Sequence, residues 1–116
     1  MDAKARLLAQ NPAPLTATLA AATTLLQPGA TAGSNEIVLD SDLLVLDPGG
    51  SARDVTLPGV SGMRKARLVI VNSADAAENL VVKNAAAATI ITIGQGETGE
   101  VIAGADWYAI GVGTST

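Results

Sequence analysis

The chain has 116 residues, with seven basic and eleven acidic side chains, a net charge of −4 and an apolar content of 48%. It contains no cysteine and no histidine, which excludes a disulfide framework, a thiolate nucleophile and the imidazole that serves as general base and as ligand of zinc or haem. The acidic balance argues against a nucleic acid partner, because phosphate neutralisation needs a basic face. A chain of this length forms one domain.

Residues 1–33 are predicted to form an N-terminal arm, and residues 34–116 a β-sandwich domain. In the arm, about two helical turns are expected over residues 3–10, before Pro12 and Pro14 end them. Residues 16–26 are left open between a strand and a second short helix, since three consecutive alanines favour the helix and four threonines favour the strand. The arm is either a frayed terminus or a segment that packs on a neighbouring subunit.

The β domain shows two kinds of predicted strand. Residues 36–40 and 53–57 alternate apolar and polar side chains, which is typical of a half-buried strand. Other segments are apolar on both faces: residues 43–46, 68–71 and 80–82. A two-layer sandwich covers one face of each sheet, so we expect the arm or another subunit to cover the second face of these strands.

Three further strands are predicted over residues 89–93, 100–103 and 107–112. The segments between the strands are rich in Gly, Pro, Asn and Asp, the residues that form turns. About eight short strands with such spacing predict an all-β, jelly-roll-like sandwich.

No apolar stretch approaches the ~20 residues that span a bilayer. The N-terminus has basic residues but breaks at Pro12 before a hydrophobic region of signal-peptide length. We therefore expect no membrane partner, and synthesis in the cytoplasm.

No enzymatic site is expected. Glu97 and Glu100 lie near one turn, but residues three apart in a strand point to opposite faces and do not converge on one substrate atom. The acids at 40, 42 and 47 lack the spaced loop of a calcium hand, and the basic cluster at 64, 65 and 67 is interpreted as solvated surface. We predict no catalytic residue, no metal and no cofactor.

A succession of short motifs over residues 36–112 resembles a β module of tailed-bacteriophage virion proteins. In that module a "TLP" strand, a "(V/I)-x-N" strand, a "GE" turn and a closing "W-Y" strand follow in order. The matching segments here are Val55-Thr56-Leu57-Pro58, Leu68-Val69-Ile70-Val71-Asn72-Ser73, Leu80-Val81-Val82-Lys83, Ile90-Ile91-Thr92-Ile93, Gly96-Glu97 and Asp106-Trp107-Tyr108-Ala109-Ile110. The closing strand follows Ala-Gly-Ala-Asp instead of the more usual Asp-Gly-Thr-Asn, which leaves the role of this loop open.

The resemblance implies a virion structural protein, and the short arm with one β domain is most similar to a capsid decoration, or cement, protein. Such proteins commonly form homotrimers on the outer surface of the phage head and bind the major capsid protein. The alternative is a head-fibre or tail-fibre domain that binds a host receptor or glycan. A third reading, an oligomerisation domain of a bacterial protein, would form the same trimer without affinity for a shell.

In a decoration protein the arm would lie on the shell or on an adjacent protomer. The candidate contact residues are Lys4, Arg6, Leu7, Leu8, Leu15 and Leu19. The two basic side chains are available to pair with an acidic shell surface. Trp107 and Tyr108, the only aromatic residues, are assigned to the closing strand, with Trp107 expected in core or rim packing.

Overall fold

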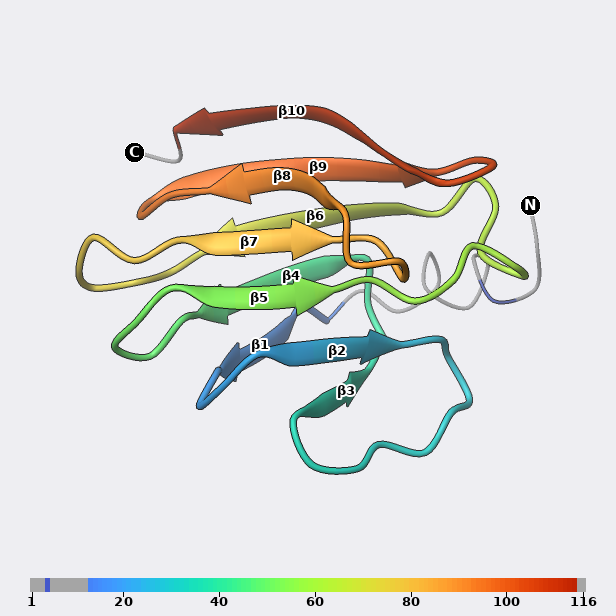
Figure 1. Cartoon of the computed structure of the whole chain (residues 1–116), viewed down its shortest axis with the longest axis horizontal. Coiled ribbons are helices and arrows are strands. Elements are labelled where there is room, and N and C mark those ends of the chain that lie inside the picture. The colour runs from blue at the N-terminus through green and yellow to red at the C-terminus, as the bar shows by residue number, and fades with distance from the viewer. Residues whose placement is uncertain (1–3, 5–12, 115–116) are drawn as a thin grey trace.

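A computed structural model describes Lys4 and residues 13–114 of the chain. The prediction of an all-β chain is confirmed, because the described residues form ten strands in two five-stranded sheets (Figure 1). The helix expected over residues 3–10 lies, apart from Lys4, outside the described residues. The strands are β1 (Leu15–Thr18), β2 (Thr23–Leu26), β3 (Glu36–Val38), β4 (Leu43–Asp47), β5 (Arg53–Thr56), β6 (Arg67–Asn72), β7 (Leu80–Lys83), β8 (Thr89–Ile93), β9 (Glu97–Ala103) and β10 (Trp107–Thr114).

The chain winds between the two sheets. The first sheet, sheet A, has the order β1-β4-β6-β9-β10, and sheet B has the order β3-β2-β5-β7-β8. Three times along the chain, a strand of sheet A is followed by a strand of sheet B: β1 and β2, β4 and β5, and β6 and β7. Within sheet A, β1, β4 and β6 run parallel to one another, and within sheet B, β2, β5 and β7 do the same. Parallel neighbours need a crossover connection, and here a strand of the opposite sheet lies within that crossover.

The last three strands are added by antiparallel pairing. β8 is antiparallel to β7, β9 is antiparallel to β6, and β10 returns along β9. Both sheets are therefore mixed. The jelly roll predicted from the sequence is not confirmed, because jelly rolls are built from antiparallel Greek keys, whereas two of the four strand pairings in sheet A and three of the four in sheet B are parallel.

Two segments of the predicted arm are strands of the sandwich: Leu15–Thr18 lies in sheet A and Thr23–Leu26 lies in sheet B. β1 pairs in parallel with β4, and β2 lies between β3 and β5. The three alanines that favour a helix form the connection between the two strands, so pairing and burial outweigh their helix propensity. The boundary drawn at residue 33 thus does not separate an arm from the sandwich.

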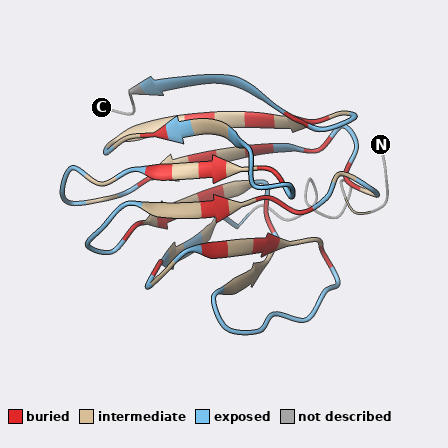
Figure 2. Cartoon of the chain, viewed as in Figure 1, coloured by how far each residue is buried: buried red, intermediate tan, exposed pale blue. Residues whose placement is uncertain are grey.

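The core lies between the sheets and is aliphatic apart from Trp107. Alternate residues of each strand point inward, and Figure 2 shows this as buried positions that alternate with half-buried ones along the central strands. At Gly99 there is little room between the sheets, because a Cβ atom there would lie 2.7 Å from Cδ1 of Ile93. A larger residue at position 99 would force this buried isoleucine to move.

Candidate interaction surface

The outer face of sheet A carries an apolar patch on β4, β6 and β9. The inward residues of β4 and β6, such as Leu44 and Ile70, are fully buried, whereas the outward residues are half-buried. The pairing places Val45 beside Val71, and strand alternation places both on the outer side. We call this surface the aliphatic face and define it by Leu43, Val45, Val69, Val71 and Ile102.

Charged groups border the aliphatic face. Arg67 lies beside Ile102, and its guanidinium is 3.8 Å from the carboxylate of Glu100. The arginine side chain is 62% exposed, so this ion pair adds little stability. Glu100 lies opposite Val69, so the uncharged part of the face is the part formed by Leu43, Val45 and Val71.

The outer face of sheet B has a different character. Three of its outward side chains are threonines, at positions 24, 56 and 92, and strand alternation puts Asp54 and Lys83 on the same side. The lysine ammonium lies 3.0 Å from the aspartate carboxylate. The outer face of sheet B is therefore the more polar one, although Leu26 and Val81 are also half-buried on this side, and sheet A presents the face that gains more from being covered.

β10 forms an edge of sheet A and carries the exposed large apolar side chains of the described residues. Tyr108 is 53% exposed, Ile110 49% and Val112 40%. The pairing with β9 slips between Ala109 and Gly111, so Ile110 forms a bulge. Bulges bend an edge strand away from regular pairing, so this edge is less suited than the aliphatic face to contact another sheet.

Trp107 and Tyr108 have different environments. Trp107 is 2% exposed, and its indole Nε1 donates to the carbonyl oxygen of Pro58 at 2.7 Å. Tyr108 lies opposite Ile102 on the outer side, at the border of the aliphatic face. The structure therefore places the first in the core and the second on the surface.

Of the contact residues predicted near the N-terminus, the structure describes Lys4, Leu15 and Leu19. Lys4 donates from Nζ to the side-chain oxygen of Gln27, and Leu15 is half-buried against the core. Leu19 is 3% exposed and belongs to the core of the chain itself, so it offers no surface to a partner. The remaining predicted contacts, Arg6, Leu7 and Leu8, lie outside the described residues.

Two asparagines that the site prediction left out organise the loops. Asn72 is 1% exposed, and its amide nitrogen donates to the carbonyl oxygens of Glu78 at 2.8 Å and Ile93 at 2.9 Å. Asn84 donates to the carboxylate of Asp106 at 3.0 Å. Asn72 is the last residue of β6, and Asn84 directly follows β7. Asparagine at the end of a strand favours a turn held by its side chain, and this position in the sequence was the signal that could have identified both residues.

The motifs that carry the family resemblance thus contact one another. The "TLP" proline accepts the hydrogen bond of the closing tryptophan, and the backbone carbonyl of Asn72 accepts from the nitrogen of Gly96 at 3.2 Å. These residues hold distant segments together, so they are structural and do not form a binding surface.

Glu97 and Glu100 do not converge on one site. The carboxylate of Glu97 accepts a hydrogen bond from the backbone nitrogen of Gly94 at 2.6 Å, whereas Glu100 pairs with Arg67 on the outer face. Strand alternation places the two glutamates on opposite sides of β9. Within residue 4 and residues 13–114, no group of three acidic side chains is placed to hold a metal ion.

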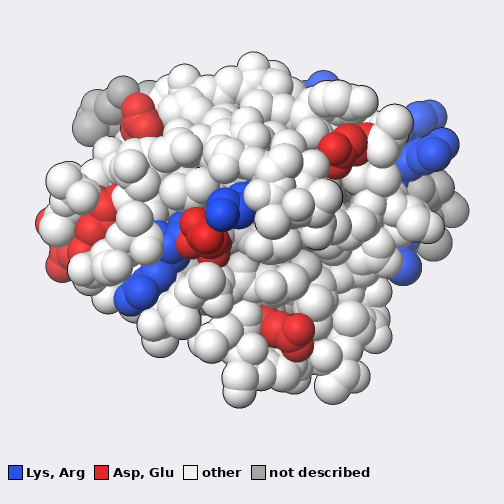
Figure 3. All heavy atoms as spheres, viewed as in Figure 1, with Lys and Arg blue, Asp and Glu red and all other residues white. Residues whose placement is uncertain are grey.

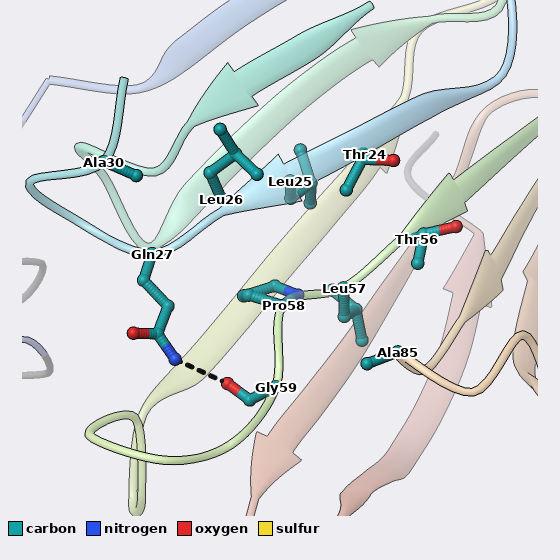
Figure 4. Close-up of a pocket in the computed structure, with 10 residues that line it drawn as sticks. All are labelled: Thr24, Leu25, Leu26, Gln27, Ala30, Thr56, Leu57, Pro58, Gly59 and Ala85. Carbon is teal, nitrogen blue, oxygen red and sulfur yellow. Dashed lines mark hydrogen bonds between the residues drawn. The ribbon is translucent and has the colours of Figure 1, made fainter. Parts of the chain in front are cut away.

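A shallow groove lies where β2 and β5 diverge (Figure 4). It has a volume of about 420 Å³, and none of its lining residues is charged. The side chain of Gln27 crosses one end and donates to the carbonyl oxygens of Gly59 at 2.8 Å and Ser61 at 2.6 Å. The groove has room for a small apolar group, but it holds no set of converging polar atoms for chemistry.

No family model matches the sequence, no curated protein matches it, and no solved structure matches the fold. Among the described residues, no helix has the length and apolar character of a membrane span.

Proposed function

We propose that the protein is a non-enzymatic structural protein of a bacteriophage virion, a capsid decoration protein that binds the major capsid protein and stabilises the expanded head shell as a homotrimer. The observation that carries this proposal is the contrast between the aliphatic face of sheet A and the polar face of sheet B. An apolar sheet face with a polar counterpart is typical of a protein that works by assembly. The motif resemblance supports the virion as the place of that assembly.

The aliphatic face is assigned to the contact between copies of the chain. The whole outer face of sheet A, with five strands about 4.8 Å apart and about five residues long, spans roughly 24 Å by 17 Å, or about 400 Å², and the aliphatic face is the part of it on β4, β6 and β9. That area is about half of the ~800 Å² that each partner buries in a stable interface. Free copies should therefore associate weakly, and the trimer should persist when each copy also contacts the shell.

Stabilisation of the shell then follows from mass action. A protein that binds the expanded lattice and not its compact precursor shifts the equilibrium toward expansion by its binding free energy. This mechanism needs a repeated surface and no reactive group.

The test is to mix the purified protein with undecorated expanded shells and with unexpanded precursors, pellet both and count the retained copies. We expect saturable retention on expanded shells in multiples set by the lattice, and at least tenfold less on precursors, as a binding difference of about 1.4 kcal/mol already gives. Retention by host cells or glycans in place of shells would contradict decoration and would support the fibre alternative.

A further inference from the structure

The loop that precedes β6 presents three basic side chains from a fixed backbone. Arg64, Lys65 and Arg67 are exposed, whereas Met63, the residue before them, is fully buried in the core. The backbone nitrogen of Lys65 donates to the carbonyl of Ala103 at 2.8 Å, and the nitrogen of Ala103 donates to the carbonyl of residue 66 at 2.9 Å. We call residues 62–67 the basic loop.

The backbone of the basic loop includes an uncommon conformation. Lys65 has a φ of 69°, in the left-handed region that non-glycine residues rarely adopt. Such a conformation persists where surrounding contacts determine it, and the two hydrogen bonds to β9 do so here. The backbone that carries the cations is therefore set before a partner arrives, which reduces the entropy lost on binding.

An aromatic side chain lies on the same face as Arg67, with β9 between them. Tyr108 is 53% exposed and lies opposite Ile102, which is itself beside Arg67. Its ring packs on Gly104, where an added Cβ would lie 3.0 Å from the ring carbon Cε2. Exposed tyrosine and arginine are the residue types enriched in the energetic centres of protein interfaces.

The acids near the basic loop are partly engaged. Asp106 accepts hydrogen bonds from the side-chain amide of Asn84 at 3.0 Å and from the nitrogen of Trp107 at 2.7 Å. Glu100 pairs with Arg67, and within residue 4 and residues 13–114 Lys65 has no ion pair. Other acids, at positions 40 and 42, are exposed before the start of β4 at the same end of the sandwich.

This end of the molecule therefore carries both signs of charge, with the cations on one fixed loop. Figure 3 shows basic side chains at the right edge of the view and a group of acidic side chains at the left edge. A continuous phosphate backbone would be repelled by the acids at positions 40 and 42, and the net charge of −4 adds to that repulsion. The acids of a folded protein surface stand at separate positions, so they can contact the basic loop without lying near the acids at positions 40 and 42.

We infer that the basic loop and Tyr108 dock on an acidic protein surface. This inference rests on the proposed function, in which that surface belongs to the shell, and it assigns the end of the sandwich that faces the shell. The loops after β4 and β6, at the opposite end, then point away from it.

The test compares two variants that lower the net charge by the same amount. Arg64→Gln with Lys65→Gln removes two cations from the basic loop, and Ser51→Glu with Ala76→Glu adds two acids to exposed positions at the opposite end. We expect the glutamine variant to bind expanded shells about tenfold more weakly than the natural protein, and its binding to depend less on salt. The glutamate variant should bind within about twofold of the natural protein, since its charges lie beyond a Debye length from the contact.

Equal binding of the glutamine variant and the natural protein would overturn the inference and leave the proposed function standing. Failure of the natural protein to bind any shell would overturn both. A DNA duplex bound by the natural protein and released by the glutamine variant would also overturn it, in favour of a polyanion.

Discussion

Replacement of Trp107 with alanine is expected to lower the free energy of unfolding by about 3–5 kcal/mol. Trp107 is 2% exposed and is the largest fully buried side chain of the described residues. Its removal leaves a cavity in an otherwise aliphatic core, and it leaves the carbonyl oxygen of Pro58 without the indole donor. Because small domains have about 5–15 kcal/mol of stability in total, the variant should be close to unfolding.

Two further variants separate packing from hydrogen bonding. Trp107→Phe keeps most of the apolar volume but cannot donate to Pro58, and we expect it to cost about 1–3 kcal/mol. Tyr108→Ala, at the adjacent exposed position, should cost less than about 1 kcal/mol. The free energy of unfolding of all three variants is measured by denaturant unfolding followed by circular dichroism. Tryptophan fluorescence does not serve, because both Trp107 variants lack the single tryptophan of the chain. Equal losses at positions 107 and 108 would contradict the inward orientation of Trp107.

Replacement of Asn72 with aspartate is expected to cost about 2–4 kcal/mol, although the two residues have the same shape. The amide nitrogen of Asn72 donates to two carbonyl oxygens, those of Glu78 and Ile93. Aspartate puts an oxygen in place of this donor, so an acceptor faces two acceptors at a position that is 1% exposed. The loop of residues 73–79 should also lose protection in hydrogen exchange.

The matched control is Asn35→Asp, which makes the same charge change at an exposed position. Asn35 has a φ of 56°, and aspartate tolerates this left-handed conformation as asparagine does. Its unfolding free energy should stay within about 0.5 kcal/mol of the natural protein. If Asn72→Asp unfolds at the same denaturant concentration as Asn35→Asp, Asn72 does not hold the loop in the way described here.

The sequence was sufficient to predict the strands with continuous apolar runs. Residues 43–46, 68–71 and 80–82 fall within β4, β6 and β7, because turn residues bound each run and the runs are too short for helices. The pairing of these strands was not predictable. Parallel neighbours such as Leu44 and Ile70 are joined by tertiary contacts, and no local pattern records which sheet a strand enters.

β1 and β2 show where local patterns fail. Leu15–Thr18 and Thr23–Leu26 are four-residue strands beside an alanine run, and only their pairing with β4 and β5 decides their conformation. For the surface, strands that are apolar on both faces predict a sheet face in need of cover, and this stays a prediction. The position of the aliphatic face on sheet A, the burial of Leu19 and the backbone conformation of Lys65 depend on tertiary contacts, which no local pattern records.

The most direct test of the aliphatic face as the assembly surface is the retention of two lysine variants on expanded shells. Val71→Lys places a charge in the middle of the aliphatic face, and Thr92→Lys places the same charge on the exposed outer side of sheet B. With both variants shown to be folded by their unfolding curves, we expect Val71→Lys to lose at least tenfold in retention, since burying an unpaired charge between subunits is costly. Thr92→Lys should bind as the natural protein does. Equal retention of the two variants would contradict the assignment of this face to assembly.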